Sequence, residues 1–297
     1  MSNKLRKMTL EKKHNLTGWA FLAPATFLIA VFSFWPMIKA LVLSFQTGKG
    51  RNMQMAGFTN YIRMFQDDVF IQSIKNTFFY FILQVPIMLV VALVLACILN
   101  KKDLRFKGFF RTMIFVPCTT SLVAYSIIFR SLFANNGLVN YVLVNIGILD
   151  KPYNFLTQPF AAKMVILLGL LWRWTGYNMV FYLAGLQNIE YSVYEAAKID
   201  GANGWKTFWK ITVPLLKPTI IMTFIMSING TLQLFDESVN LTKGGPANST
   251  ITMSHYIYNT CFINVPNFGY AAAMSFIIFI MVAVLAFINL KVGDTRD

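Results

Sequence analysis

Glu195-Ala-Ala-Lys-Ile-Asp-Gly-Ala-Asn-Gly-Trp-Lys-Thr-Phe-Trp-Lys-Ile-Thr-Val-Pro214 is a polar island between two long apolar runs. Ser192 and Glu195 stand at the spacing of a capping box, which predicts the start of a helix at Ser192. Asp200-Gly201 predicts the end of that helix, because glycine tolerates the left-handed conformation that follows many helices.

A second helix is expected to open at Asn203 or Gly204 and to be stopped by Pro214 and Pro218. Its apolar side would consist of Trp205, Phe208, Trp209 and Ile211. The island is therefore predicted to be a helix–turn–helix.

The composition indicates a membrane protein. Of the 297 residues, 56% are hydrophobic and only 13% are charged, whereas a soluble domain carries about 25% charged residues. The net charge of +14 would suggest nucleic acid as the partner of a soluble protein. Here the basic residues lie beside apolar runs, which favours an anionic membrane surface and no nucleic-acid partner.

The sequence offers no catalytic or metal-binding motif. The three cysteines, Cys97, Cys118 and Cys261, have no metal or redox spacing, and a disulfide framework is not expected. His14 and His255 are far apart and are interpreted as ordinary polar residues. Because no Gly-x-x-x-x-Gly-Lys-Ser/Thr loop occurs, we do not expect this chain to hydrolyse ATP by the usual route.

Six apolar runs are each near the roughly 20 residues needed to cross a bilayer. They cover residues 19–45, 78–99, 112–133, 161–186, 219–235 and 270–290. The first run is too long for a signal peptide and lacks a clear cleavage site. We therefore predict an all-α, polytopic membrane protein: a tail (1–17), a six-helix transmembrane domain (18–290) that contains the loop 190–218, and a second tail (291–297).

The charge distribution predicts the orientation. With the N-terminus in the cytoplasm, the inside segments hold 16 Lys and Arg residues and the outside loops hold six. Cytoplasmic loops carry the excess of positive charge in membrane proteins. Both termini and the polar island are thus expected on the cytoplasmic side.

The island resembles the EAA loop of binding-protein-dependent ABC import permeases. The family pattern is Glu-Ala-Ala, then Asp-Gly-Ala, then a spaced Phe, Ile and Pro. It is matched without departure by Glu195, Ala196, Ala197, Asp200, Gly201, Ala202, Phe208, Ile211 and Pro214. The resemblance implies that these residues form the coupling helix, which docks into a groove of a cytoplasmic ATPase.

Further motifs are similar to the carbohydrate branch of this family. They are Asn60-Tyr61, Phe65, Phe70 and Asn76-Thr77 before the second run, and Gly137, Asn140 and Leu143 after the third. Over nearly the whole chain the resemblance is to the first permease of maltose- and lactose-type importers. It implies the type I importer permease fold, and import of a sugar, expected to be an oligosaccharide.

The resemblance also implies the surroundings of the chain. The expected partners are a second permease subunit, two copies of a cytoplasmic ATPase, an extracytoplasmic sugar-binding protein and membrane lipid. The chain itself would need no cofactor and would not be an enzyme, since ATP and magnesium would bind to the ATPase. The expected location is the cytoplasmic membrane of a bacterium.

Polar residues inside the fourth and fifth runs are candidates for substrate contacts, because such groups are costly in a membrane and tend to face a water-filled path. Helical spacing places Trp172, Thr175, Gly176 and Met179 on one face. Ser227 and Thr231 share a face of the fifth run with Gly230 and Leu234, and Gln233 lies beside them. Aromatic rings stack on sugar rings, and amides and hydroxyls bond sugar hydroxyls.

Two alternatives to these contacts stay open. Small and polar residues also hold packed membrane helices together, so each of them can serve packing instead of substrate binding. Arg173 is expected to pair with a neighbouring helix or the partner subunit. In the maltose-type permease, which resembles this chain, the sugar contacts come from these two spans; Gly176 matches that pattern, whereas Trp172, Met179 and Leu234 do not.

The alternatives to a sugar import permease are an ion-coupled secondary transporter, a membrane-embedded hydrolase and a permease for another solute. An ion-coupled secondary transporter usually carries acidic or histidine relays inside the membrane, and none of the six runs has an acidic residue in its middle. A membrane-embedded hydrolase would need a nucleophile–base or metal motif. A permease of the same family for glycerol phosphate or another polar solute is a further alternative.

Overall fold

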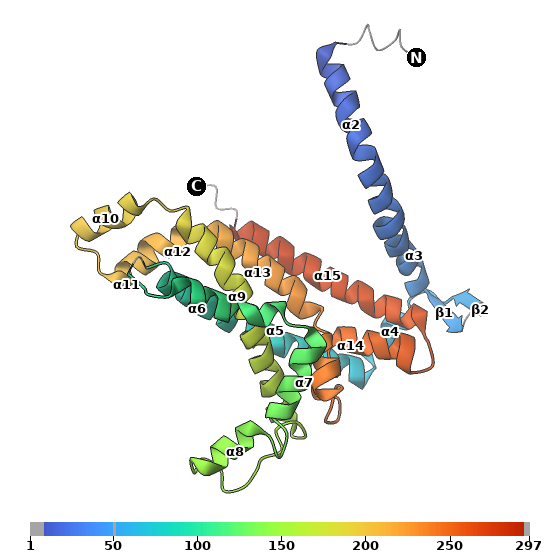
Figure 1. Cartoon of the computed structure of the whole chain (residues 1–297). Helices are drawn as coiled ribbons and strands as arrows, with labels where there is room; N and C mark the ends of the chain where they lie inside the picture. The colour runs from blue at the N-terminus through green and yellow to red at the C-terminus, as the bar shows by residue number, and fades with distance from the viewer. Residues whose placement is uncertain (1–8, 50–51, 102, 294–297) are drawn as a thin grey trace.

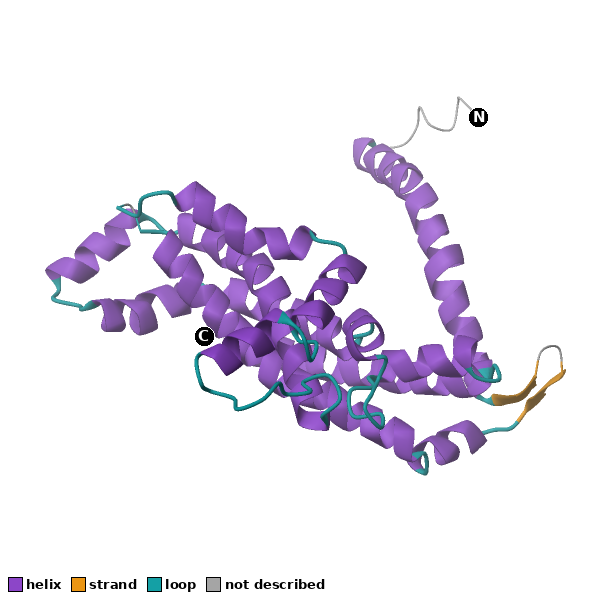
Figure 2. Cartoon of the chain, turned by 60° about the horizontal axis from the view of Figure 1, so that its bottom comes forward, coloured by secondary structure: helices purple, strands orange, loops and turns teal. Residues whose placement is uncertain are grey.

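The protein is almost entirely helical in a computed structural model that describes residues 9–49, 52–101 and 103–293. Figures 1 and 2 show an elongated helical bundle with one short hairpin at its edge. The hairpin consists of β1 (Gln46–Lys49) and β2 (Asn52–Met55), which pair antiparallel with Gln46 opposite Met55. The expected all-α fold is confirmed apart from this hairpin.

Four helical segments are long and apolar enough to cross a membrane. They are Leu10–Ser44, Asp68–Leu99, Pro159–Gln187 and Phe268–Lys291. Two bent helix pairs pass the same test together, so the described chain has up to six spans if each pair counts as one. Each of the six predicted runs overlaps one of these segments.

The first segment contains α2 (Leu10–Ile29), a π-helical turn (Ala30–Phe34) and α3 (Trp35–Ser44). It begins at Leu10, so the end of the predicted tail 1–17 is helical, and residues 1–8 lie outside the described residues. Figure 1 shows α2 extending away from the bundle. None of its most apolar window is buried, so α2 has no packing partner within the described chain.

The second segment, α5 (Asp68–Leu99), also begins earlier than the predicted run 78–99. Asp67 accounts for this start, because its carboxylate accepts hydrogen bonds from the backbone N–H groups of Val69, at 3.0 Å, and Phe70, at 3.2 Å. Such a cap satisfies donors that the first turn of a helix leaves free.

The predicted run 112–133 is not one helix. It is divided between α6 (Lys107–Thr119) and α7 (Leu122–Leu132), which meet at 99°. The Thr119 and Thr120 hydroxyls donate to the carbonyls of Val116 and Pro117, at 2.8 and 2.7 Å, and the backbone of Thr120 is extended. Hydroxyl side chains that bond nearby carbonyls compete with helix formation, which explains the break.

The core lies between α5 and α9 (Pro159–Gln187), where fully buried apolar residues from both helices interlock. α13 (Lys217–Leu232) and α15 (Phe268–Gly293) pack beside α5. α15 also packs against α3, and Gly269 permits the approach of the end of α3 and the start of β1: a Cβ there would lie 2.0 Å from the backbone oxygen of Gln46 and 3.1 Å from that of Leu43. The first and last membrane segments are thus in contact.

Short helices cover the two ends of the bundle. They are α4 (Thr59–Phe65), α8 (Leu138–Asn145), α10 (Tyr191–Ile199), α11 (Gly204–Thr207), α12 (Val213–Leu215) and α14 (Met253–Tyr258). Figure 1 shows α10 and α11 at one end, and the hairpin with α4 and α14 at the other. The polar island and the hairpin therefore lie at opposite ends of the bundle.

Candidate functional site

A cavity of about 310 Å³ lies between α5, α9, α13 and the segment that follows α13. Its wall combines aromatic, amide, hydroxyl and carboxylate groups with apolar side chains. Its polar and aromatic lining residues include Gln84, Trp174, Tyr177, Asn178, Ser227, Asn229, Thr231, Gln233, Asp236 and Glu237. We call this space the central cavity.

Hydrogen bonds organise the wall of the central cavity. The Thr231 hydroxyl donates to the side-chain oxygen of Gln84 at 2.6 Å, and both residues are buried. The Gln84 amide nitrogen in turn contacts the sulfur of Met88, at 3.2 Å. Asn178 donates to the Trp174 carbonyl at 3.0 Å. Amides and hydroxyls of this kind can exchange partners with the hydroxyls of a polar solute.

The three candidates from the fifth run all line this cavity. Ser227 donates to the Thr223 carbonyl one turn earlier, at 2.7 Å. Gln233 is exposed and its amide donates to the side chain of Asn229, which lines the same cavity. Ser227, Thr231 and Gln233 are therefore brought together, as their spacing indicated.

The four candidates from the fourth run lie elsewhere. Met179 is fully buried in the core against α5. Trp172, Thr175 and Gly176 border a second, mostly apolar hollow of about 420 Å³ between α5, α6 and α9. A Cβ at Gly176 would lie 1.9 Å from the Ile114 carbonyl oxygen, so this glycine admits the backbone of α6 rather than a solute.

The neighbouring face of α9 lines the central cavity instead. Trp174, Tyr177 and Asn178 line it at the spacing i, i+3, i+4. The sequence contains this pattern as well, but helical spacing alone does not decide which of two adjacent polar faces packs against a neighbouring helix. The position of α6 decides it here.

Arg173 is bound to the break between α6 and α7. Its guanidinium donates to the Thr120 carbonyl at 2.7 Å and to the Thr120 hydroxyl at 3.3 Å. It also lies 5.3 Å from the ring centres of Tyr125 and Trp174, within range of cation–π attraction. The expected pairing with a neighbouring helix is therefore observed, and the guanidinium satisfies a carbonyl that the broken helix leaves free.

The polar island forms the expected helix–turn–helix. α10 ends in a Schellman motif, in which the N–H of Ala202 bonds the carbonyl of Ala197 at 2.9 Å and the N–H of Gly201 bonds that of Lys198 at 3.2 Å. Gly201 has a φ of +74°, the left-handed conformation that was predicted. Asn203 opens α11, because its side chain accepts from the Lys206 N–H at 2.9 Å.

Two details of the island differ from the prediction. Ser192 does not cap α10: the extended backbone of the cap position is at Glu190, and the Ser192 hydroxyl bonds the Glu190 carboxylate at 3.3 Å. Pro214 does not stop the second helix, because a wider π-helical turn (Phe208–Thr212) precedes it and α12 continues through it. The chain bends by 69° only after α12, and Pro218 lies in the first turn of α13.

The island exposes an apolar surface. Ile199, Trp205 and Trp209 are 86%, 72% and 51% exposed, which is unusual for side chains of this size at the end of a bundle. Ala197 is buried and Phe208 packs toward the core, whereas Glu195, Ala196 and Gly201 are exposed. The motif residues are therefore divided between holding the island in shape and facing outward.

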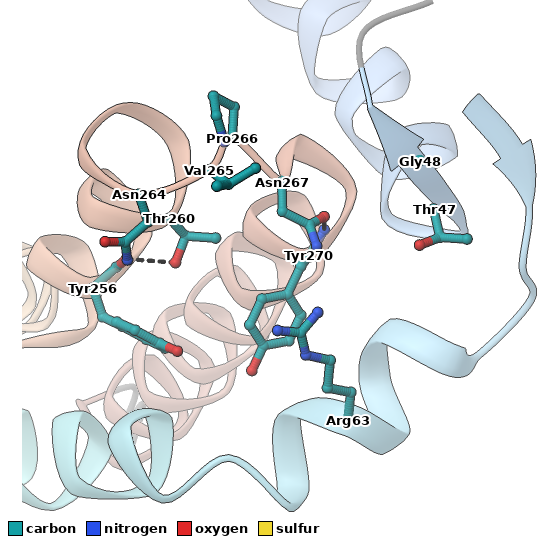
Figure 3. Close-up of a pocket in the computed structure, with 10 residues that line it drawn as sticks. All are labelled: Thr47, Gly48, Arg63, Tyr256, Thr260, Asn264, Val265, Pro266, Asn267 and Tyr270. Carbon is teal, nitrogen blue, oxygen red and sulfur yellow. Dashed lines mark hydrogen bonds between the residues drawn. The ribbon is translucent and has the colours of Figure 1, made fainter. Parts of the chain in front are cut away.

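The opposite end of the bundle has a polar cavity of about 380 Å³. Figure 3 shows Arg63 of α4 lying over the ring of Tyr270 of α15, with Tyr256 of α14 beside them. The guanidinium is 4.5 Å from the Tyr270 ring centre. Next to this cavity, the Tyr256 and Tyr270 hydroxyls donate to the Asp67 carboxylate at 2.6 and 2.7 Å.

Asp67 therefore links α4, α5, α14 and α15 at the hairpin end. Burial alone would raise the pKa of Asp67, but the hydrogen bonds from Tyr256, Tyr270 and two backbone N–H groups outweigh it and lower the pKa. No group of three or more His, Cys, Asp or Glu residues suited to a metal ion occurs among the described residues.

Comparisons with known proteins identify the family. The sequence pattern of the family described as "Binding-protein-dependent transport system inner membrane component" matches residues 70–293, most of the chain. The chain belongs to this family. The permease is thus a multi-pass component of the inner membrane, it is not itself an enzyme, and ATP is bound by a separate ATPase.

Relatives of this permease have similar lengths. The lactose transport system permease protein of Rhizobium radiobacter is 52% identical over 98% of both chains. An arabinooligosaccharides transport system permease protein of Bacillus subtilis is 33% identical over 93% of this chain and 88% of its own. The resemblance to binding-protein-dependent import permeases, based on the island, is confirmed, and the ion-coupled alternative is wrong.

A solved structure has the same fold. A chain of a bacterial alginate ABC transporter, in complex with an alginate pentasaccharide-bound periplasmic protein, matches with a TM-score of 0.83 and 25% identity, over 96% of both chains. The ABC importer permease fold predicted for this chain is therefore confirmed, and a periplasmic binding protein is a partner of the complex to which the permease belongs.

Proposed function

We propose that this permease imports a di- or oligosaccharide, and that the sugar crosses the membrane through the central cavity. The wall of that cavity supports this function most strongly, because Trp174 and Tyr177 line it together with the side chains of Gln84, Asn178 and Thr231. Aromatic faces suit the C–H surfaces of sugar rings, and amides suit their hydroxyls. The 52% identity to a lactose permease supports a disaccharide such as lactose.

The candidates on the other face of α9 are less able to contact a sugar in the central cavity. Trp172 is 44% exposed and can meet a sugar only from the second hollow. Thr175 and Gly176 lie against α6, and Met179 belongs to the core. The sugar contacts are therefore assigned first to Ser227, Thr231 and Gln233, with Trp174, Tyr177 and Asn178 added from α9.

A second permease subunit would complete the path. α2 is apolar and lacks a packing partner in the described chain, which suits a helix that packs on another subunit or on lipid. The exposed Ile199, Trp205 and Trp209 of the island would dock onto one of two ATPase copies, which hold ATP and magnesium. The excess of basic residues on these segments supports a cytoplasmic location, in a bacterium, for the island and for both tails, 1–17 and 291–297.

The assembled importer tests this proposal. The permease, its partner subunit and two ATPase copies are reconstituted in proteoliposomes with the binding protein, and uptake of labelled lactose and of larger saccharides is followed. Uptake should require ATP, and the permease alone should move no sugar. ATP-dependent uptake by the permease alone, or a complete importer that accepts no saccharide, would contradict the proposal.

A further inference from the structure

The charged groups of the central cavity are all acidic. Asp236 and Glu237 line it, and no lysine or arginine does. Both follow the end of α13, so the two carboxylates stand on the same stretch of the wall. The side of the transport path that this chain supplies is therefore negative, which bears on the class of solute that can enter.

The charge of Arg173 acts on Glu237, but its guanidinium is not available to a solute. Arg173 is only 6% exposed, and its guanidinium is bound to Thr120 and lies against Trp174 and Tyr125. It does not line the central cavity. Arg173 therefore serves the break between α6 and α7, and none of the described basic residues lines the cavity.

The two carboxylates differ in accessibility. Glu237 is 3% exposed, and burial raises its pKa, an effect that the charge of Arg173 partly offsets. Asp236 is only half-buried, and its carboxylate has no hydrogen-bond or ion-pair partner among the described residues. Asp236 is thus the carboxylate that remains free to meet a solute.

A free carboxylate discriminates between neutral and anionic solutes. Its two oxygens accept hydrogen bonds from adjacent sugar hydroxyls, and such bonds to an ionised acceptor are stronger than neutral ones. A phosphate or a second carboxylate has no proton to offer and is repelled by the like charge. Specificity of this kind depends on the repulsive element as much as on the attractive one.

We propose that Asp236 makes the central cavity selective for neutral saccharides and against solutes that carry phosphate or carboxylate groups. The inference rests on the proposed function, since it concerns the same cavity. It excludes glycerol phosphate and uronate saccharides as cargo of this permease, and it gives Asp236 a specificity-determining role.

Direct binding to the whole importer in lipid nanodiscs tests the inference, without the binding protein, whose own specificity would mask the effect. The probes are galactobiose and its acidic counterpart digalacturonate, and the dissociation constants come from equilibrium dialysis. The wild-type complex should bind galactobiose at least tenfold more tightly. Asp236→Asn should bring the two constants together by tightening digalacturonate, and Asp236→Lys should reverse the preference.

Two control variants separate the effect of the Asp236 charge from effects on folding and from the loss of a carboxylate elsewhere. Asp236→Glu keeps the carboxylate and should keep the preference, which separates charge from folding. Asp150→Asn removes an exposed carboxylate from a loop outside the cavity and should change neither constant. Equal binding of both disaccharides by the wild type, or an unchanged ratio in Asp236→Asn, would overturn the inference alone. Failure of the wild type to bind any saccharide would overturn it together with the proposed function.

Discussion

Thr231 of α13 and Gln84 of α5 are 147 residues apart in sequence, yet they are joined by a buried hydrogen bond of 2.6 Å. The bond crosses one side of the central cavity, and both residues line that cavity. It therefore combines two roles: it ties α13 to α5, and it fixes the Gln84 side chain within the wall of the cavity.

Replacement of Thr231 separates these roles. Thr231→Val keeps the shape but removes the donor, and an unpaired buried acceptor costs about 1–3 kcal/mol. We expect lower thermal stability of the importer and slower sugar uptake. Thr231→Ser retains the hydroxyl and should remain near wild type in both. Equal uptake by the valine and serine variants would show that the bond has no part in transport.

Gly176 is predicted to be a packing residue. Gly176→Ala places a Cβ 1.9 Å from the Ile114 carbonyl oxygen, so α6 has to move away from α9. Overpacking of this kind costs about 1–3 kcal/mol, and the melting temperature of the purified importer should fall. Gly230→Ala is the matched control, since a Cβ there meets nothing within 4 Å. A stable Gly176→Ala variant with altered sugar preference would instead support the substrate contact first expected for this residue.

Gly201 is predicted to keep the polar island in its docking shape. Its φ of +74° disfavours any side chain, and a β-branched one most of all. Gly201→Val should weaken capture of the ATPase and reduce substrate-stimulated ATP hydrolysis. Gly201→Asn should retain most of both, because asparagine tolerates the left-handed conformation. A similar loss of ATPase capture in the valine and asparagine variants would indicate that the left-handed backbone of Gly201 does not determine docking.

Glu195 is predicted to contact the ATPase directly. It is exposed on α10 and does not cap the helix, so its carboxylate is available to a basic partner. Glu195→Gln would remove a charge-assisted bond worth about 1.5–3 kcal/mol, which is roughly a tenfold or greater loss of affinity. Affinity for the ATPase is measured by titration. Glu190→Gln lies outside the motif and should leave the affinity for the ATPase unchanged. An equal loss of affinity in the Glu190 and Glu195 variants would show that the overall charge of the island matters and not the position of Glu195.

Asp67 should make the stability of the importer depend on pH. A carboxyl with a lowered pKa in the folded state contributes stability that is present above its unfolded pKa of about 3.9 and is lost as pH falls through the folded value. Asp67→Asn should therefore lower the melting temperature at pH 7, and the difference from wild type should shrink below about pH 4. Asp68→Asn, at an exposed neighbour, is the matched control, and its melting temperature at pH 7 should stay near that of the wild type.

The sequence predicted the parts of the fold that depend on local properties. Hydropathy located the six apolar runs, and the turn at Gly201 followed from the need for a left-handed residue. The broken span was missed because the run 112–133 has the length and overall hydropathy of one span, whereas its break depends on the Thr119 and Thr120 hydroxyls turning back to the main chain. An apolar window carries no information about such bonds.

The candidate site was predicted in part for a similar reason. Ser227, Thr231 and Gln233 were found because the helix that carries them has one polar side facing open space. On α9 two polar faces compete, and the choice between Gly176 and Trp174 depends on α6, a helix distant in sequence. Asp236 was not among the candidates, because its lack of a partner is a property of the folded chain.

The contact of α3 with α15 has a consequence for biogenesis. Among the membrane segments that the structure describes, the one translated earliest packs against the one translated latest, at the close approach of Gly269 to Gln46. Throughout translation, the leading span must therefore hold its place in the bilayer through its own hydropathy. The described bundle can therefore complete its packing only once α15 has been made, and a chain cut short before residue 268 would lose the contacts of α15 with α3 and α13.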